Sequence, residues 1–134
     1  MVVTGPVLAD TSVWVSFLRR GPALAPAFSK ALEERRVVTV GPVVAELLQG
    51  VAAEARTEVE QRLGAMPFVP LGRREWIIAG HVSGALRGRG TPVNLVDVAI
   101  ATAARSAEIP VLTADRDFLK IAEVIGDLQV QLVD

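Results

Sequence analysis

Carboxylate side chains recur at four places in the sequence where a predicted strand ends or a predicted helix begins. Asp10 and Asp115 each follow a short apolar strand, whereas Glu46 and Asp97 fall in the first turns of predicted helices. A helix that feeds a parallel strand runs antiparallel to it, so the helix begins at the sheet edge where that strand ends. We therefore expect all four acids to meet at one edge, which is where open α/β sheets bind their ligands.

Several carboxylates at one sheet edge are suited to a divalent cation. Such groups repel one another, and some of them stay protonated unless a cation is present. The starts of the helices lower the cost of the negative charge at Glu46 and Asp97. With oxygen ligands only, the natural cation is Mg²⁺, with Mn²⁺ as a substitute. A cation of this kind activates bound water and holds a phosphodiester, so the expected chemistry is metal-dependent phosphodiester hydrolysis.

Each acid also has an explanation that involves no ligand. Asp97 lies three residues after Asn94 and can complete a capping box, and Asp10 can cap the helix that follows it. Asp115 and Asp117 can be ordinary turn formers. Together these explanations require independent coincidences at one sheet edge, so a shared acidic site is the better interpretation.

Other polar side chains stand close to the acids in the sequence. Thr11, Ser12 and Asn94 are expected first as helix caps and only second as contacts to metal-bound water or phosphate. Arginine suits bidentate contacts with phosphate, and Arg87 and Arg89 lie in a glycine-rich loop that leads into the next predicted helix. These two are the arginines that we expect near a substrate, whereas the others fit solvated loop edges and helix ends.

The elements that carry these residues alternate between strand and helix. Strands are predicted over residues 7–9, 36–40, 111–113 and 129–133, with a short extended piece at 68–71. Helices are predicted over residues 11–20, 25–34, 43–48, 54–63, 75–86 and 94–107, and another follows the acidic turn at 115–117. This alternation predicts an α/β fold with a mainly parallel sheet, an edge strand at its end and a single domain over residues 1–134.

Composition narrows the class of protein further. The 134 residues are 51% hydrophobic with a formal net charge of −1, which indicates a folded domain without a general attraction to nucleic acid. The absence of cysteine excludes disulfides, a thiolate nucleophile and a cysteine-based zinc site. His81 is the only histidine, which excludes a two-histidine ribonuclease mechanism. The sequence shows no signal peptide and no bilayer-spanning apolar run, so we expect a soluble cytoplasmic protein.

Four segments of the sequence resemble the PIN domain family, and specifically the small VapC-type toxins of bacterial and archaeal toxin–antitoxin pairs. They are LADTSVW at 8–14, VVAELLQG at 43–50, VNLVDVAIATAA at 93–104 and VLTADRDF at 111–118. No single segment is specific, but the ordered set with its spacing is, and the resemblance covers nearly the whole chain.

The resemblance implies a PIN-like three-layer fold, with a central sheet in the order 3-2-1-4-5 flanked by helices. It implies an Mg²⁺-dependent endoribonuclease whose acidic set is Asp10, Glu46, Asp97 and Asp115. Asp10 and Asp97 are then the primary metal ligands and Asp115 a further one, while Glu46 positions or deprotonates the attacking water. Asp117 fits the local pattern as well as Asp115 does, so the choice of the fourth acid stays open.

The resemblance also implies partners. These are an RNA substrate, a second copy in a homodimer, and a VapB-type antitoxin that docks on the helical hairpin from Val43 to Leu63 and blocks the site. Two other functions are still open: a catalytically silent PIN-like module that binds RNA or protein, and a metal-dependent phosphatase of the haloacid-dehalogenase type. The phosphatase chemistry requires an aspartate two residues after the nucleophile, where this sequence has Ser12.

Overall fold

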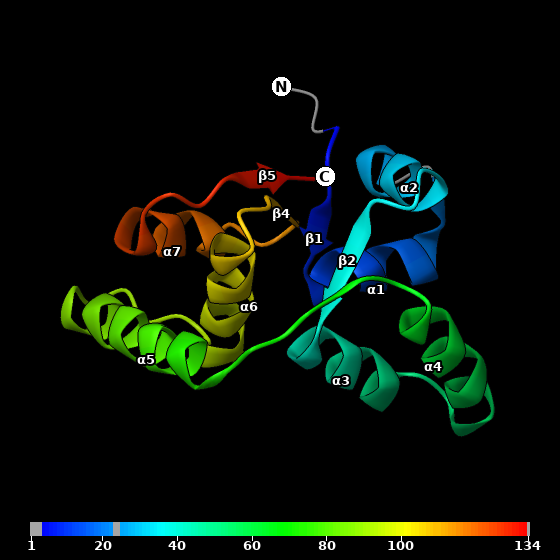
Figure 1. The fold of residues 1–134 in the computed structure, drawn as a ribbon, viewed down its shortest axis with the longest axis horizontal. Helices are drawn as coiled ribbons and strands as arrows, with labels where there is room; N and C mark the ends of the chain where they lie inside the picture. Colours follow the sequence, from blue (N-terminus) through cyan, green and yellow to red (C-terminus); the bar gives the residue numbers. More distant parts are fainter. Residues whose placement is uncertain (1–3, 23–24, 134) are drawn as a thin grey trace.

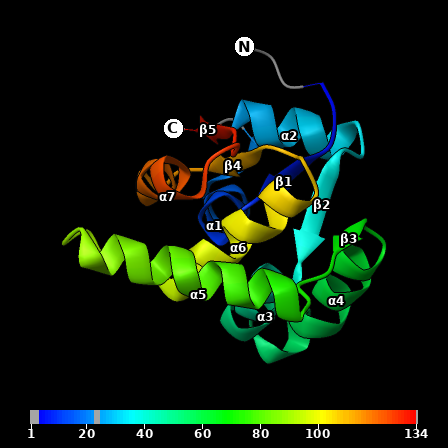
Figure 2. The ribbon, with the colours of Figure 1, turned by 60° about the vertical axis from the view of Figure 1, so that its left-hand side comes forward.

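The computed structural model describes residues 4–22 and 25–133 and contains a central sheet of five parallel strands (Figures 1 and 2). The strands lie in the order β3-β2-β1-β4-β5. Their bounds are β1 Val7–Ala9, β2 Val37–Val40, β3 Phe68–Val69, β4 Val111–Thr113 and β5 Val130–Leu132. The predicted α/β class, the mainly parallel sheet and the strand order are therefore confirmed.

Seven α-helices connect the strands within the described ranges. They are α1 Thr11–Arg20, α2 Pro26–Glu33, α3 Gly41–Gly50, α4 Arg56–Gly64, α5 Arg73–Gly88, α6 Leu95–Ser106 and α7 Asp117–Ile125, with a 3₁₀ turn, η2, at Ala53–Ala55. Helices α5, α6 and α7 pack on one another, whereas α1 packs on α2 and α3, and α3 packs on α4. Figure 1 shows the first group on the left and the second on the right with strands between them, which makes three layers.

The inner strands and α6 form most of the core. Every residue of β1, β2 and β4 is buried, as expected for parallel strands that are covered on both faces. Helix α6 is buried continuously from Val98 to Ala104, and Figure 2 shows α5 lying across it. The many alanines of this run let neighbouring helices approach closely. This packing fixes where α6 begins, and therefore where Asp97 lies.

Two helix boundaries differ from the predicted ones in ways that affect the site. The sequence predicts a helix over 43–48 that Gly41 and Pro42 open, and α3 begins at Gly41 itself, directly after β2. Glu46 therefore lies in the second turn of α3, whereas the sequence predicts it in the first turn. The helix predicted to end at residue 86 continues to Gly88, so Arg87 is helical and does not lie in a loop.

The other predicted elements are present close to their expected bounds. The extended piece at 68–71 is reduced to the two-residue strand β3, and the helix predicted over 54–63 begins as the 3₁₀ turn η2 and continues as α4. None of the helices in the described ranges combines the length and the apolar character that crossing a membrane requires.

Candidate functional site

The carboxyl edge of the sheet collects the four predicted acids from separate parts of the chain. Strands β1 and β4 are paired neighbours, and Asp10 and Asp115 follow their carboxyl ends. The pairing continues past β1, since the Asp10 N–H donates a hydrogen bond of 3.0 Å to the carbonyl of Leu112. Glu46 lies on α3, which packs against both α1 and α6, and Asp97 lies in the first turn of α6. In Figure 1 this edge is marked by the tip of the β2 arrow, where α3 begins.

Asp10 is the most enclosed of these acids, with 3% of its surface exposed. Its Oδ1 accepts hydrogen bonds from the Ser12 hydroxyl at 2.6 Å and from the Val13 N–H at 3.4 Å. Its Oδ2 accepts one from the Thr113 hydroxyl at 3.0 Å. Burial raises the pKa of Asp10, although these hydrogen bonds act in the opposite direction. Asp10 thus caps α1 and also faces the shared edge, so its capping role does not exclude a ligand.

The carboxylates of Asp115 and Asp117 differ in their hydrogen bonds and ion pairs. Asp115 Oδ1 accepts a hydrogen bond of 2.9 Å from the N–H of Asp117, the first residue of α7. The Asp117 carboxylate forms an ion pair of 3.0 Å with Lys120. Asp115 forms no ion pair within the described part of the chain. This difference favours Asp115 over Asp117 as the acid available to a cation.

Glu46 is exposed on the second turn of α3. The Thr11 hydroxyl of α1 donates a hydrogen bond of 2.6 Å to Glu46 Oε1. We predicted Thr11 and Ser12 first as helix caps, and that prediction is wrong, because Asp10 caps α1. Both hydroxyls instead contact carboxylates of the acidic edge, where Ser12 donates to Asp10.

Asp97 is half-buried and has neither a hydrogen bond nor an ion pair with any residue that the structure describes. It therefore does not complete a capping box. The pKa of Asp97 is raised from 3.8 to about 6. Burial is the largest cause, followed by the negative charges of Asp115, Asp10, Glu46 and Asp117 in that order. These four charges are all carboxylates, which makes this edge favourable for a cation.

The fit to a metal ion rests on the chemistry of the donors. Among the described residues, no three carboxylate or imidazole groups lie close enough to form a ready-made metal cluster. Mg²⁺ keeps several waters and is usually held by only one or two carboxylates, so a looser set of acids suits it. Unpaired carboxylate oxygens beside Asp97 therefore fit Mg²⁺ or Mn²⁺, and not a cation that prefers nitrogen or sulfur.

Three residues that we expected near the substrate, Asn94, Arg87 and Arg89, form no hydrogen bond or ion pair with the four acids in the part of the chain that the structure describes. Asn94 caps α6 by accepting a hydrogen bond of 2.7 Å from the Val96 N–H, as expected for its first role. Arg87 is exposed in the last turn of α5, and Arg89 is exposed just after that helix. Neither arginine is among the charges that shift the pKa of Asp97.

Thr113 is the residue that the sequence reading missed. It is the last residue of β4 and is fully buried, and its hydroxyl contacts Asp10 while accepting a hydrogen bond of 2.9 Å from the Asp115 N–H. The sequence reading treats Val111–Thr113 only as an apolar strand. A threonine at the end of a buried strand, two residues before an aspartate, is the signal that could have identified it.

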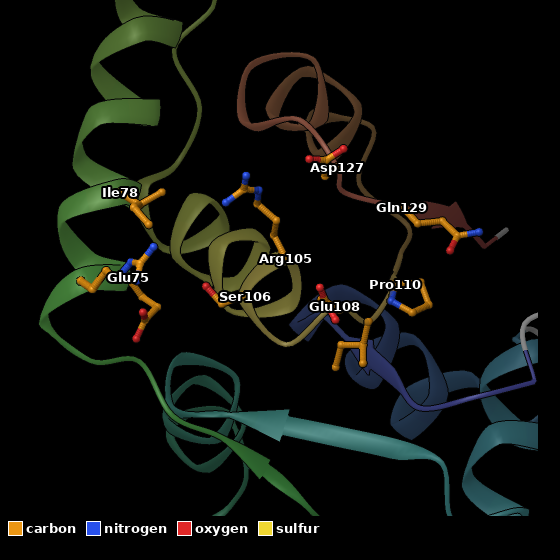
Figure 3. A pocket seen from close by; sticks show the side chains of 10 residues that line it. Glu75, Ile78, Arg105, Ser106, Glu108, Pro110, Asp127 and Gln129 are labelled. Atoms are coloured by element: carbon orange, nitrogen blue, oxygen red, sulfur yellow. The ribbon is translucent and has the colours of Figure 1, made fainter.

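A cavity of about 640 Å³ lies at the opposite edge of the sheet (Figure 3). Its lining comes from the start of α5, the end of α6 and the segments before β4 and β5, and Figure 3 shows Arg105, Glu108 and Asp127 around it. The four acids do not line this cavity. It is therefore separate from the acidic edge.

Comparison with known proteins gives the family. Residues 7–124 match the PIN domain family. VapBC-5 from Mycobacterium tuberculosis, a member of the VapBC family of toxin-antitoxin systems, is 25% identical with a TM-score of 0.62, over 97% of this chain and 98% of that chain. DNA-bound VapBC from Salmonella typhimurium is 22% identical with a TM-score of 0.74, over 96% of this chain and 98% of that chain.

VapBC2 from Rickettsia felis, bound to a promoter DNA fragment, is 16% identical with a TM-score of 0.73, over 96% of this chain and 98% of that chain. At such identities the Salmonella and Rickettsia structures show a common fold. The family match spans most of the sequence and confirms the resemblance drawn from its four segments. The chain therefore belongs to the PIN domain family, and the solved structures it resembles include VapBC complexes.

Proposed function

We propose that this chain is the VapC-type toxin of a toxin–antitoxin pair and that it hydrolyses RNA phosphodiesters as an Mg²⁺-dependent endoribonuclease. The observation that carries the proposal is the meeting of Asp10, Glu46, Asp97 and Asp115 at the carboxyl edge of the sheet. None of these acids forms an ion pair within the described residues. Membership of the PIN domain family supports the same assignment.

In this proposal the residues of the site have different roles in hydrolysis. Asp97, Asp10 and Asp115 would hold Mg²⁺, which when bound lowers the pKa of its water and stabilises charge on the phosphate. Glu46 has one carboxylate oxygen occupied by the Thr11 hydroxyl, and its other oxygen is available to orient or deprotonate the attacking water. Because Glu46 is exposed, an RNA strand can reach it without a change in the fold.

The partners follow from the same assignment. Solved structures similar to this chain include VapBC complexes, which supports a VapB-type antitoxin as its partner. The hairpin of α3 and α4, residues 43–63, carries Glu46 and is the surface that we propose for antitoxin docking. We further propose that the chain forms a homodimer, which light scattering coupled to size-exclusion chromatography would test.

The decisive experiment is cleavage of a mixed RNA substrate by purified protein with Mg²⁺, with EDTA, and by the Asp97→Asn variant. The proposal expects cleavage only by the wild type with Mg²⁺. Asp127→Asn is the matched control, because Asp127 is an exposed acid at the opposite edge of the sheet and asparagine tolerates its positive φ. Cleavage that persists in EDTA or in Asp97→Asn would point to a contaminating nuclease.

A catalytically silent RNA- or protein-binding module is the second candidate. It is favoured by one observation, that no three acids among the described residues are close enough to form a metal cluster. Calorimetric titration with Mg²⁺ separates the two candidates. Binding that is lost in Asp97→Asn supports the nuclease, whereas absence of both binding and cleavage supports the silent module.

A further inference from the structure

We propose that Ser12 and Thr113 are positioning residues that hold the Asp10 carboxylate and the β4–α7 turn in one fixed arrangement. In this arrangement one lone-pair position, on Oδ2 of Asp10, stays available for a ligand. We name Ser12 and Thr113 the hydroxyl clamp. The inference rests on the proposed function, since it assigns how the same acidic site is kept in shape.

The clamp consists of two parallel chains of hydrogen bonds from the β4–α7 turn to Asp10. In the first, the Ala114 N–H donates to Ser12 Oγ at 3.2 Å, and the Ser12 hydroxyl donates to Asp10 Oδ1 at 2.6 Å. In the second, the Asp115 N–H donates to Thr113 Oγ1 at 2.9 Å, and the Thr113 hydroxyl donates to Asp10 Oδ2 at 3.0 Å. Each hydroxyl therefore links one carboxylate oxygen to the backbone of the turn.

The direction of both chains is fixed by the backbone. An amide N–H can only donate, so each hydroxyl oxygen must accept from it and turns its own hydrogen towards another acceptor. The Thr113 hydroxyl also lies 3.5 Å from the Asp115 carbonyl, but the carboxylate at 3.0 Å is closer and is the stronger acceptor. Such chains strengthen one another in a buried setting, and Asp10 and Thr113 are both buried.

The same contacts determine which oxygen of Asp10 can face a ligand. A carboxylate has about four lone-pair positions, two on each oxygen. Oδ1 accepts from Ser12 and from the Val13 N–H, so both of its positions are used. Within the described part of the chain, Oδ2 accepts only from Thr113, so it keeps one position for a ligand. Asp10 is therefore arranged to offer one oxygen, Oδ2, to a cation or to a water on it.

The clamp also couples two acids that come from opposite ends of the chain. Thr113 contacts Asp10 through its side chain and Asp115 through the backbone N–H of that residue. A displacement of the β4–α7 turn would stretch both chains of hydrogen bonds at once. The relative position of Asp10 and Asp115 is consequently set by the two hydroxyls in addition to the pairing of β1 with β4.

The first test measures amide hydrogen exchange by NMR in the metal-free protein. In Thr113→Val the Asp115 amide loses its acceptor and is expected to exchange about tenfold faster, while the Ala114 amide changes less. In Ser12→Ala the pattern is reversed. Thr39→Val is the matched control, because Thr39 is a buried strand threonine whose hydroxyl bonds to the Pro67 carbonyl at 3.2 Å.

The second test measures RNA cleavage with Mg²⁺ in the same variants. Thr113→Val and Ser12→Ala are expected to lower kcat by about 10–100-fold with little change in KM, as is typical when a residue that orients a metal ligand is removed. Thr113→Ser keeps the hydroxyl and is expected to restore most of the kcat. Equal losses in Thr113→Ser and Thr113→Val would overturn the clamp, because they would show that the methyl group matters and not the hydroxyl.

Two further outcomes are also decisive. If Thr113→Val loses its cooperative thermal transition, Ser12→Ala carries the test, since Ser12 is only partly buried. If the wild type cleaves no RNA, the proposed function fails but the amide exchange still decides the clamp. Faster exchange at Asp115 or Ala114 in the matching variant then supports the clamp, and wild-type exchange at both amides overturns it.

Discussion

Thr11 on α1 holds Glu46 on α3 through a hydrogen bond of 2.6 Å between residues 35 positions apart. A free glutamate side chain on a helix surface samples many rotamers, and fixing it costs about 1–2 kcal/mol of side-chain entropy. The hydroxyl of Thr11 reduces the number of rotamers before any substrate is bound. Glu46 is therefore exposed but already oriented.

Thr11→Val is expected to lower RNA cleavage by about tenfold, because Glu46 loses the hydroxyl that orients it, while the fold is kept. Thr11→Ser keeps the hydroxyl and is the matched control. Steady-state kinetics together with thermal unfolding would check this. Wild-type kcat in Thr11→Val would show that Glu46 needs no partner on α1.

Asp97→Asn is expected to make the metal-free protein more stable at neutral pH. The variant removes a charge that burial and four neighbouring carboxylates make unfavourable. The gain in the free energy of unfolding is about 1 kcal/mol, once the shift is discounted because Asp97 is half-exposed. Urea unfolding in EDTA at pH 7 measures it. A destabilised variant would indicate that Asp97 supports the start of α6.

The same gain is expected to depend on pH in a defined direction. The pKa of Asp97 is about 6 in the folded protein against an ordinary value of 3.8, so the folded state binds this proton more tightly. The stability from that proton is fully present below pH 3.8 and is lost as the pH rises through 6. The stability difference between Asp97→Asn and the wild type should therefore grow from about pH 4 to pH 7.

Mg²⁺ is expected to stabilise the wild type and to have a weaker effect on Asp97→Asn. A ligand that binds only the folded state adds about 2.7 kcal/mol when its concentration is about 100 times its Kd. The melting temperature with MgCl₂, compared with NaCl at equal ionic strength, would detect this. Equal shifts in both proteins would place the bound cation away from Asp97.

Asp115→Asn is expected to reduce cleavage more than Asp117→Asn does. The Asp117 carboxylate already pairs with Lys120, and Asp115 has the larger electrostatic effect on Asp97. Loss of an exposed pair such as that of Asp117 with Lys120 costs at most about 1 kcal/mol. Parallel assays of the two variants would distinguish the acids. A larger loss in Asp117→Asn would reverse the assignment.

The sequence was sufficient to predict the sheet and the set of acids at its edge. The alternation of strands and helices predicts an α/β fold, and the resemblance to the PIN domain family implies the strand order that the structure has. The position of Glu46 was harder to predict from the sequence. Gly41 and Pro42 let α3 begin directly after β2, which shifts the turn in which Glu46 lies.

The contacts of the hydroxyl groups could not be read from the sequence. Asp10, Thr11 and Ser12 are all good caps for α1, and nothing local decides which of them accepts from the helix N–H groups. In the structure Asp10 caps α1, whereas Ser12 bonds to the turn after β4 and Thr11 to Glu46 on α3. Thr113 was missed for the same reason, since its partner Asp10 lies 103 positions away.

The pairing of β1 with β4 also sets when the site can appear during synthesis. Asp10, Glu46 and Asp97 all leave the ribosome before Thr113 does, because they precede it in the sequence. Asp10 cannot acquire its partner on β4 until Thr113 has been made, and such distant pairings form late in folding. A nascent chain therefore holds Asp10, Glu46 and Asp97 before the contact between Asp10 and Thr113 can form, so the acidic edge is completed only after β4 has been made.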